Sequence, residues 1–189
     1  MFQGISIAFS SPLVALYLIM VLSTTIGFNL IEFTVLMIFL FILPLFIPLY
    51  YSAKKGIEWD YPVRRERIKP MSLVTLNYIV GLIVMVLANA REHVRLLMFT
   101  YMVIALAVTI ITFFYKISIH VASISGPATY LALIGLTEYS ILFYILSLIV
   151  GISRIYLKRH TIGQIISGYI ASIIIALIAY LVYSHIAIL

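Results

Sequence analysis

Cysteine is absent and charged side chains are scarce in this sequence of 189 residues. The absence of cysteine excludes disulfide bonds, metal sites built on thiolates and a cysteine nucleophile. Only 10% of the residues are charged, whereas 65% are hydrophobic, and a water-exposed surface needs a much larger charged fraction. The composition therefore excludes a soluble domain and predicts a single membrane domain, residues 1–189.

Long apolar runs make up most of the chain, and a run of about 20 apolar residues is what spans a bilayer. We expect an all-α, polytopic membrane bundle of six to seven hydrophobic helices. The expected helices cover residues 11–28, 31–51, 71–90, 94–115, 121–136, 139–151 and 161–185. An N-terminal hairpin (1–51) would precede a motif-bearing core (52–168), and the final helix would occupy residues 161–189.

The densest group of reactive side chains lies between Ser153 and Gln164, a polar stretch between two apolar runs. A neutral histidine is a good nucleophile near neutral pH, and the donors of an arginine match phosphate oxygens. His160 and Gln164 are four residues apart, so on a helix they share a face and the Gln carbonyl can hold one imidazole N–H. Arg154 and His160 are separated by roughly 240° around a helix, so we expect the helix to break between them.

A second polar motif, Lys116-Ile117-Ser118-Ile119-His120, follows the fourth apolar run. A histidine in this position is often satisfied by a backbone carbonyl, but ionisable residues at membrane depth usually mark function. On a helix, Lys116 lies one turn from His120 and shares its face. The 32 residues between His120 and Ser153 suffice for two short helices. Such a hairpin would return the chain to the same side of the membrane.

The only long polar stretch, residues 52–70, holds nine charged residues around Trp59, Tyr61 and Pro62. We expect it to connect the second and third helices as a loop. One interpretation is a basic juxtamembrane loop that contacts anionic lipid headgroups and is anchored by its aromatic side chains. The other interpretation is a loop that binds phosphate. The sequence leaves both open.

The pattern Ser153-Arg154, five residues, His160 resembles the third signature of the type 2 phosphatidic acid phosphatase superfamily of membrane phosphatases. The usual signature continues with three residues and an Asp, where this chain has Gln164. The form Ser-Arg-x-Tyr-Leu-x-x-His-Thr-x-x-Gln is similar to the branch that includes dolichyl diphosphatases and glucose-6-phosphatases, in which Gln also occurs.

The other two signatures of the superfamily have weaker counterparts. Ser118 and His120 match two of the four residues of the second signature, Pro-Ser-Gly-His. The first signature, Lys, six residues, Arg-Pro, is present only in a degraded form. Asp60 takes the place of the Lys, Arg67 matches the Arg, and Lys69 with the following proline is displaced by two residues.

The resemblance implies a metal-independent lipid phosphatase that hydrolyses a phosphate or diphosphate monoester of an isoprenoid carrier, such as dolichyl or polyprenyl diphosphate. His160 would form a phosphohistidine, His120 would be the general acid and base, and Gln164 would orient His160. The expected phosphate-binding residues are Arg154, Ser153, Ser118, Lys116, Arg67, Asp60, Arg64 and Lys69. We expect no metal and no other cofactor. The expected partners are the lipid phosphate and the bilayer, and no nucleic acid.

Four alternatives stay open at this point. The substrate could be phosphatidic acid or phosphatidylglycerophosphate, or the chain could transfer a phosphoryl or head group between lipids. The degraded first and second signatures and Gln164 would suit a lipid-binding or transport relative without catalysis. The motif matches could also be chance features of a membrane scaffold.

The three motifs follow the second, fourth and sixth apolar runs, so they are expected at the same side of the membrane. That side holds ten of the twelve basic residues, and only Arg91 and Arg95 belong to the other side. The positive-inside rule then predicts that the motif-bearing side faces the cytoplasm at the cell membrane.

Overall fold

The computed structural model describes residues 2–58 and 60–188, with side chains up to residue 185. Trp59, the predicted aromatic anchor, therefore lies outside the described residues, as do the first and last residues of the predicted domain. Within the described ranges the chain is all-helical and has no strand.

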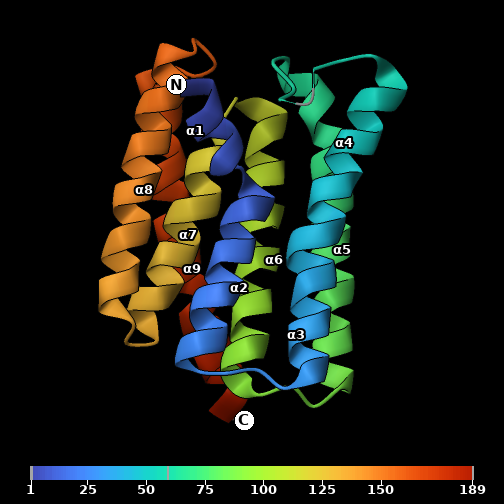
Figure 1. The fold of residues 1–189 in the computed structure, drawn as a ribbon, viewed down its shortest axis with the longest axis vertical. Helices are drawn as coiled ribbons and strands as arrows, with labels where there is room; N and C mark the ends of the chain where they lie inside the picture. Colours follow the sequence, from blue (N-terminus) through green and yellow to red (C-terminus); the bar gives the residue numbers. More distant parts are fainter. Residues whose placement is uncertain (1, 59, 189) are drawn as a thin grey trace.

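The helices stand side by side as a bundle (Figure 1). In chain order they are α1 (Phe2–Ala8), α2 (Ser11–Thr25), α3 (Leu30–Leu36), the π-helical turn η1 (Met37–Ile42), α4 (Leu43–Lys55), α5 (Arg64–Leu87), α6 (Glu92–Phe114), α7 (Ile119–Leu133), α8 (Thr137–Tyr156) and α9 (Ile162–Ile188). Five rods are long and apolar enough to cross a membrane: α3 to α4 as one rod, α5, α6, α8 and α9. The pair α1 and α2, bent by 57°, would be a sixth. The chain is a multi-pass membrane protein.

The polar stretch 52–70 is mostly helical, so the prediction of a loop there was wrong. Helix α4 continues to Lys55 and α5 begins at Arg64, which leaves only residues 56–63 between them. Arginine, glutamate and lysine are good helix formers, and a membrane helix extends beyond the hydrocarbon region at no cost. Pro70 lies inside α5, where neighbouring helices tolerate it. Helix α1 was not predicted at all.

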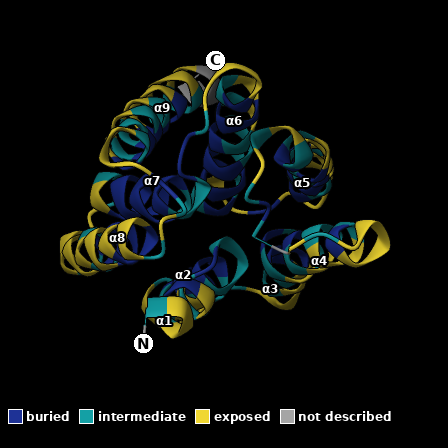
Figure 2. Ribbon diagram, turned by 90° about the horizontal axis from the view of Figure 1, so that it is seen from above, coloured by how far each residue is buried: buried dark blue, intermediate teal, exposed yellow. Residues whose placement is uncertain are grey.

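Helix α7 is the central element of the bundle, surrounded by α2, α6, α8 and α9 (Figure 2). Its 15 residues give a length of about 22 Å, too short to span a bilayer alone. Gly126 permits the close approach of α6, because a Cβ there would lie 2.4 Å from a methyl carbon of Ile104. Ser125 and Ser172 hydrogen-bond across to α9 at 2.7 Å.

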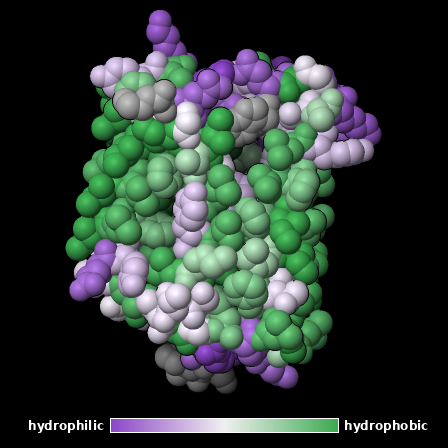
Figure 3. All heavy atoms as spheres, viewed as in Figure 1, coloured by the Kyte–Doolittle hydropathy of each residue, from purple (hydrophilic) through white to green (hydrophobic). Residues whose placement is uncertain are grey.

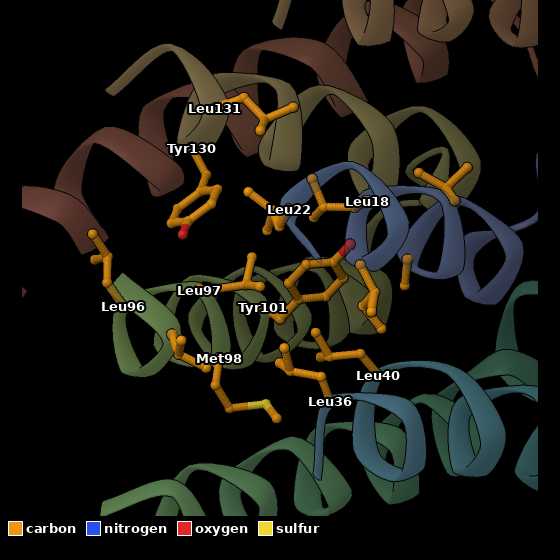
Figure 4. Close-up of a cluster of buried hydrophobic side chains, with 14 of the residues drawn as sticks. Leu18, Leu22, Leu36, Leu40, Leu96, Leu97, Met98, Tyr101, Tyr130 and Leu131 are labelled. Atoms are coloured by element: carbon orange, nitrogen blue, oxygen red, sulfur yellow. The ribbon is translucent and has the colours of Figure 1, made fainter. Parts of the chain in front are cut away.

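The main hydrophobic core joins α2, α3, η1, α6 and α7. Figure 4 shows Leu18 and Leu22 of α2 against Leu97 and Tyr101 of α6, all buried. Lipid chains are as apolar as leucine, so within a bilayer this core is stabilised by van der Waals packing and not by removal of the side chains from water. This core fixes the N-terminal helices against the central helix.

Polar side chains gather at the two ends of the molecule, with an apolar belt between them (Figure 3). At one end the carboxylate of Glu32, fully buried, accepts hydrogen bonds from the backbone N–H groups of Asn29 at 3.0 Å and Arg91 at 2.9 Å, and from the Arg91 guanidinium. At the opposite end lie the 56–63 loop, the α6–α7 connection and the α8–α9 turn (Figure 1). The hairpin of α7 and α8 brings the last two together, as the sequence predicts.

The π-helical turn η1 leaves one carbonyl without its helical partner. In a π-helix each N–H bonds to the carbonyl five residues earlier, as Leu43 N–H does to Ile38 O. Pro44 has no N–H, so the carbonyl of Phe39 is free to accept another donor. The side-chain amide of Asn77 on α5 donates to it at 2.7 Å. This bond ties α5 to the irregular part of the neighbouring rod.

We expect Asn77→Leu to lower the free energy of unfolding by about 1–3 kcal/mol, because a buried carbonyl loses its donor. In a Pro44→Ala background residue 44 regains an N–H, so the same substitution should cost much less. Thermal unfolding of the four proteins in detergent measures this coupling. Equal costs in both backgrounds would contradict the assignment of Asn77 to the carbonyl freed by Pro44.

Candidate active site

Two segments distant in the sequence are joined by hydrogen bonds at one end of the bundle. The backbone N–H of Ser118 donates to the carbonyl of Gln164 at 3.1 Å. The ammonium of Lys116 donates to the carbonyl of Arg159 at 3.1 Å. These bonds hold the start of α7 against the start of α9. Gly168 permits this approach, because a Cβ at that position would lie 2.9 Å from the carbonyl oxygen of Ser118.

The break between α8 and α9 turns the chain back toward itself, as the spacing of Arg154 and His160 requires. Helix α8 ends at Tyr156, and Lys158 adopts a left-handed backbone with a φ of 53°. The N–H of Arg159 then donates to the carbonyl of Arg154 at 3.0 Å, the six-to-one bond of a Schellman motif. The turn brings the His160 imidazole back beside the end of α8.

Gln164 has two roles in the geometry of His160. It completes a capping box with Thr161: its side-chain oxygen accepts the Thr161 N–H at 3.3 Å, and the Thr161 hydroxyl accepts the Gln164 N–H at 3.4 Å. The same side-chain oxygen lies 2.9 Å from Nδ1 of His160. Because a backbone N–H fixes which amide atom faces the turn, Nδ1 of His160 carries the proton. Nε2 therefore keeps its lone pair.

His160 is neutral in this environment. Burial lowers the pKa of its imidazole to about 3, and the charges of Arg67 and Arg154 contribute in the same direction. Only 6% of the residue is exposed. An unprotonated Nε2 near neutral pH is the form that a nucleophilic or accepting histidine requires.

Arg154 is almost completely buried, with 1% of its surface exposed. One terminal nitrogen donates to both carboxylate oxygens of Asp60 at 2.8 and 2.7 Å, and the other donates to the hydroxyl of Ser6 at 2.7 Å. A buried guanidinium needs such partners to offset its desolvation. The α8 helix, the 56–63 loop and α1 are thus connected through one side chain.

Two further cations lie beside this pair. Arg67 is buried, and its Nε donates to the carbonyl of Tyr61 at 2.7 Å. Lys116 is half-buried, and burial together with the charge of Arg67 lowers the pKa of its ammonium. The prediction that Lys116 shares a helix face with His120 was wrong, because α7 begins only at Ile119. Lys116 reaches the cluster from the connection between α6 and α7 instead.

Four buried polar atoms of the cluster have no hydrogen-bond partner among the described residues. They are Nε2 of His160, Nε2 of His120, Nε of Arg154 and the hydroxyl of Ser118. Buried polar groups are nearly always paired. Five further atoms of this kind among the described residues lie outside the cluster, but four unpaired atoms in the residues of two motifs are typical of a ligand-binding site.

A cavity of about 200 Å³ extends from this cluster between α2, α4, α5, α6 and α7. Asp60, Arg67 and His120 form its polar end, and its walls are mostly apolar down to Tyr78 and Tyr101. A cavity of 150 Å³ accommodates a benzene ring, so this one has room for roughly eight carbon atoms. It can hold the first part of a single hydrocarbon chain whose polar head lies at the cluster.

Three residues expected to bind phosphate have other contacts in this structure. The guanidinium of Arg64 donates to the carbonyls of Thr112, at 3.1 Å, and Phe113 at the end of α6. The ammonium of Lys69 lies 6.0 Å from the centre of the Tyr51 ring. The hydroxyl of Ser153 donates to the carbonyl of Val150 within its own helix at 2.8 Å.

Sequence reasoning missed Ser6 and Arg159. The hydroxyl of Ser6 is a hydrogen-bond partner of Arg154. No local sequence pattern predicts this contact, because it spans 148 positions. Arg159 pairs with Glu58 at 2.7 Å and with Asp60 at 3.4 Å. The sequence signal that could have identified Arg159 was its position directly before His160. Asp60, expected to bind phosphate, is the ion-pair partner of Arg154 in this structure.

No protein-family model, curated protein or solved structure matches the chain. In the part of the chain that the structure describes, no group of three or more histidine and acidic side chains is placed to hold a metal ion.

The lowered pKa of His160 should make stability depend on pH. In the unfolded chain this histidine titrates near pH 6.5, whereas its pKa in the folded protein is about 3. Between these values the unfolded chain binds one more proton, so stability falls as the pH falls, by about 1.4 kcal/mol per unit from this group.

His160→Gln removes this contribution. Unfolding temperatures of both proteins in detergent, measured from pH 7.5 to pH 5, should show a variant that loses less stability on acidification. A difference between the two proteins that stays constant with pH would show that His160 is not held neutral by the fold.

Proposed function

We propose that this chain is a membrane lipid phosphatase that hydrolyses a phosphate or diphosphate monoester of an isoprenoid carrier lipid, through a phosphohistidine at His160. One observation carries the proposal: the unprotonated Nε2 of His160 is buried among the cations of Arg67, Arg154 and Lys116, and no described residue forms a hydrogen bond with it. This combination supports a nucleophilic role for His160, because the surrounding positive charge would attract a phosphate.

The charges of the cluster do not balance. Arg67, Arg154 and Lys116 contribute three positive charges, and Asp60 is the carboxylate that lies among them. Arg159 has a carboxylate of its own in Glu58. The remaining surplus of about two charges matches a phosphate monoester near neutral pH, which carries about −1.5 to −2. In a site with little water, such fixed donors stabilise the spread charge of phosphoryl transfer.

The proposed reaction has two steps. Nε2 of His160 attacks the terminal phosphorus, the bond from phosphorus to the bridging oxygen breaks, and His120 donates a proton to that oxygen. Water then attacks the phosphohistidine, His120 takes its proton, and phosphate leaves. His120 lines the polar end of the cavity and its Nε2 has no partner among the described residues, which suits it to take the proton of the attacking water.

Gln164 would orient the nucleophile. Its side-chain oxygen accepts a hydrogen bond from Nδ1–H of His160, and this bond directs Nε2 away from α9. An amide is neutral, so it stabilises the cationic phosphohistidine less than a carboxylate would. The capping box of Gln164 and Thr161 supplies the rigidity that the orientation needs.

The apolar cavity supports a single-chain lipid as the substrate. A diacylglycerol phosphate divides into two chains within a few bonds of its phosphate, whereas an isoprenoid continues as one. With room for roughly eight carbon atoms, the cavity would take the first one or two isoprene units. The rest of the chain would lie in the bilayer, so the enzyme would accept isoprenoids of different lengths.

The proposal agrees with the resemblance of Ser153, Arg154 and His160 to the third signature of the type 2 phosphatidic acid phosphatase superfamily. Membership in that superfamily is part of the proposal. So is a site that faces the cytoplasm at the cell membrane, because ten of the twelve basic residues belong to the helix ends and loops on that side.

The deciding experiment measures phosphate release by the purified protein in detergent, with and without EDTA. The substrates are polyprenyl diphosphate, polyprenyl monophosphate and phosphatidic acid. We expect release from the isoprenoids, reduced at least about a thousandfold in His160→Ala. Gln164→Ala should lose only about ten- to hundredfold, because it removes an orienting bond. His93→Ala, at the opposite end of the bundle, is the control and should keep full activity.

The products distinguish the alternatives. A new phosphorylated lipid without free phosphate would indicate transfer between lipids. Binding of polyprenyl diphosphate without turnover, in a folded protein, would refute the phosphatase and favour a lipid-binding relative. Equal losses in Gln164→Ala and His160→Ala would show that the amide is as necessary as the nucleophile.

A second prediction concerns Asp60, whose carboxylate accepts two hydrogen bonds from the guanidinium of Arg154. Asp60→Asn removes a negative charge from the place where phosphate must bind. We expect inorganic phosphate to inhibit this variant roughly tenfold more tightly than the wild type, because an opposing charge is gone. Glu58→Gln, which changes an exposed carboxylate in the same loop, should have little effect. Weaker inhibition in Asp60→Asn would show that Asp60 supports phosphate binding by holding Arg154.

A further inference from the structure

A second groove lies outside the candidate active site, between the end of α4 and the first turns of α5. It has a volume of about 410 Å³, and three lysines line it: Lys54 and Lys55 from α4 and Lys69 from α5. None of the residues assigned to the reaction lines this groove. Lys69, which resembled part of a phosphate-binding signature, belongs here.

The charge in the groove has no counterpart within the described residues. None of the three lysines forms an ion pair there, and no carboxylate lines the groove. The ammonium of Lys54 lies 6.0 Å from the centre of the Tyr50 ring, and that of Lys69 lies 6.0 Å from the Tyr51 ring. Aromatic faces attract cations only weakly at exposed positions. Three neighbouring ammonium groups therefore still favour an anion.

The walls of the groove become apolar along α4 and α5, away from the polar end of the bundle. Ile47 and Leu73 line it, and Phe46 and Leu76 are exposed on the same two helices at 60% and 56% of their surface. Tyrosines mark the level of lipid headgroups in membrane proteins. An occupant would therefore place its charge at the lysines and its apolar part along the outer faces of α4 and α5.

We infer that this groove binds an anionic phospholipid of the surrounding bilayer. Its lysines would contact the phosphate of the headgroup, and the acyl chains would lie against the apolar walls. Clusters of basic residues beside membrane helices attract anionic lipids in this way. The lipid would connect the ends of α4 and α5, which flank the 56–63 loop carrying Asp60.

The test compares unfolding temperatures in nanodiscs of phosphatidylcholine alone and with one fifth phosphatidylglycerol. The wild type should gain roughly 2–4 °C from the anionic lipid. The variant Lys54→Gln/Lys69→Gln should lose at least half of this gain. The control Arg65→Gln/Lys158→Gln removes the same charge from exposed positions at the same end of the bundle, outside the groove, and should keep the gain.

Native mass spectrometry of the protein released from the mixed nanodiscs gives a second readout. One retained phosphatidylglycerol is expected on the wild type and on the control, and none on the groove variant. Equal losses of the thermal gain in both double variants would overturn the inference, because a general surface charge would then explain the attraction. No loss in either variant would overturn it too. Neither measurement depends on catalysis.

Discussion

A guanidinium group buried in a membrane protein must be surrounded by partners, and in this chain that requirement falls on Arg154. Its partners are Asp60 in the loop after α4 and Ser6 in α1. Removal of one partner from a buried ion pair typically costs about 3–5 kcal/mol. The positions of α1, the 56–63 loop and α8 therefore depend on this one side chain, and so does the geometry around His160.

The candidate site combines a rigid histidine with an excess of positive charge. The turn after α8 and the capping box at the start of α9 fix the imidazole, and burial keeps it neutral. Arg67 and Lys116 approach from two other segments. Without a bound anion this arrangement is electrostatically unfavourable, because like charges repel strongly in a medium of low dielectric constant. A bound phosphate group would relieve that repulsion.

Two kinds of lipid contact would then be separated in space. The apolar cavity opens from the polar cluster into the interior of the bundle, between α2 and the helices α4 to α7. The lysine groove lies on the outer side of α4 and α5. The polar segment 52–70 allowed two interpretations, phosphate binding or contact with lipid headgroups. The structure divides its residues, with Asp60 and Arg67 turned to the cluster and Lys69 turned to the groove.

Sequence alone determined the membrane character, the helical class and the common side of the three motifs, because hydropathy and run length depend on local composition. It also determined the helix break between Arg154 and His160. Two side chains six positions apart on one continuous helix point in different directions, so they can converge only if the helix ends between them. Only the tertiary structure decided the partners of Arg154. It also decided the hydrogen bond from the Asn77 amide to the Phe39 carbonyl and the bonds from the Arg64 guanidinium to carbonyls at the end of α6. These are contacts between side chains and groups far away in the chain. No local periodicity encodes such distances, which arise only when packed helices bring the groups together.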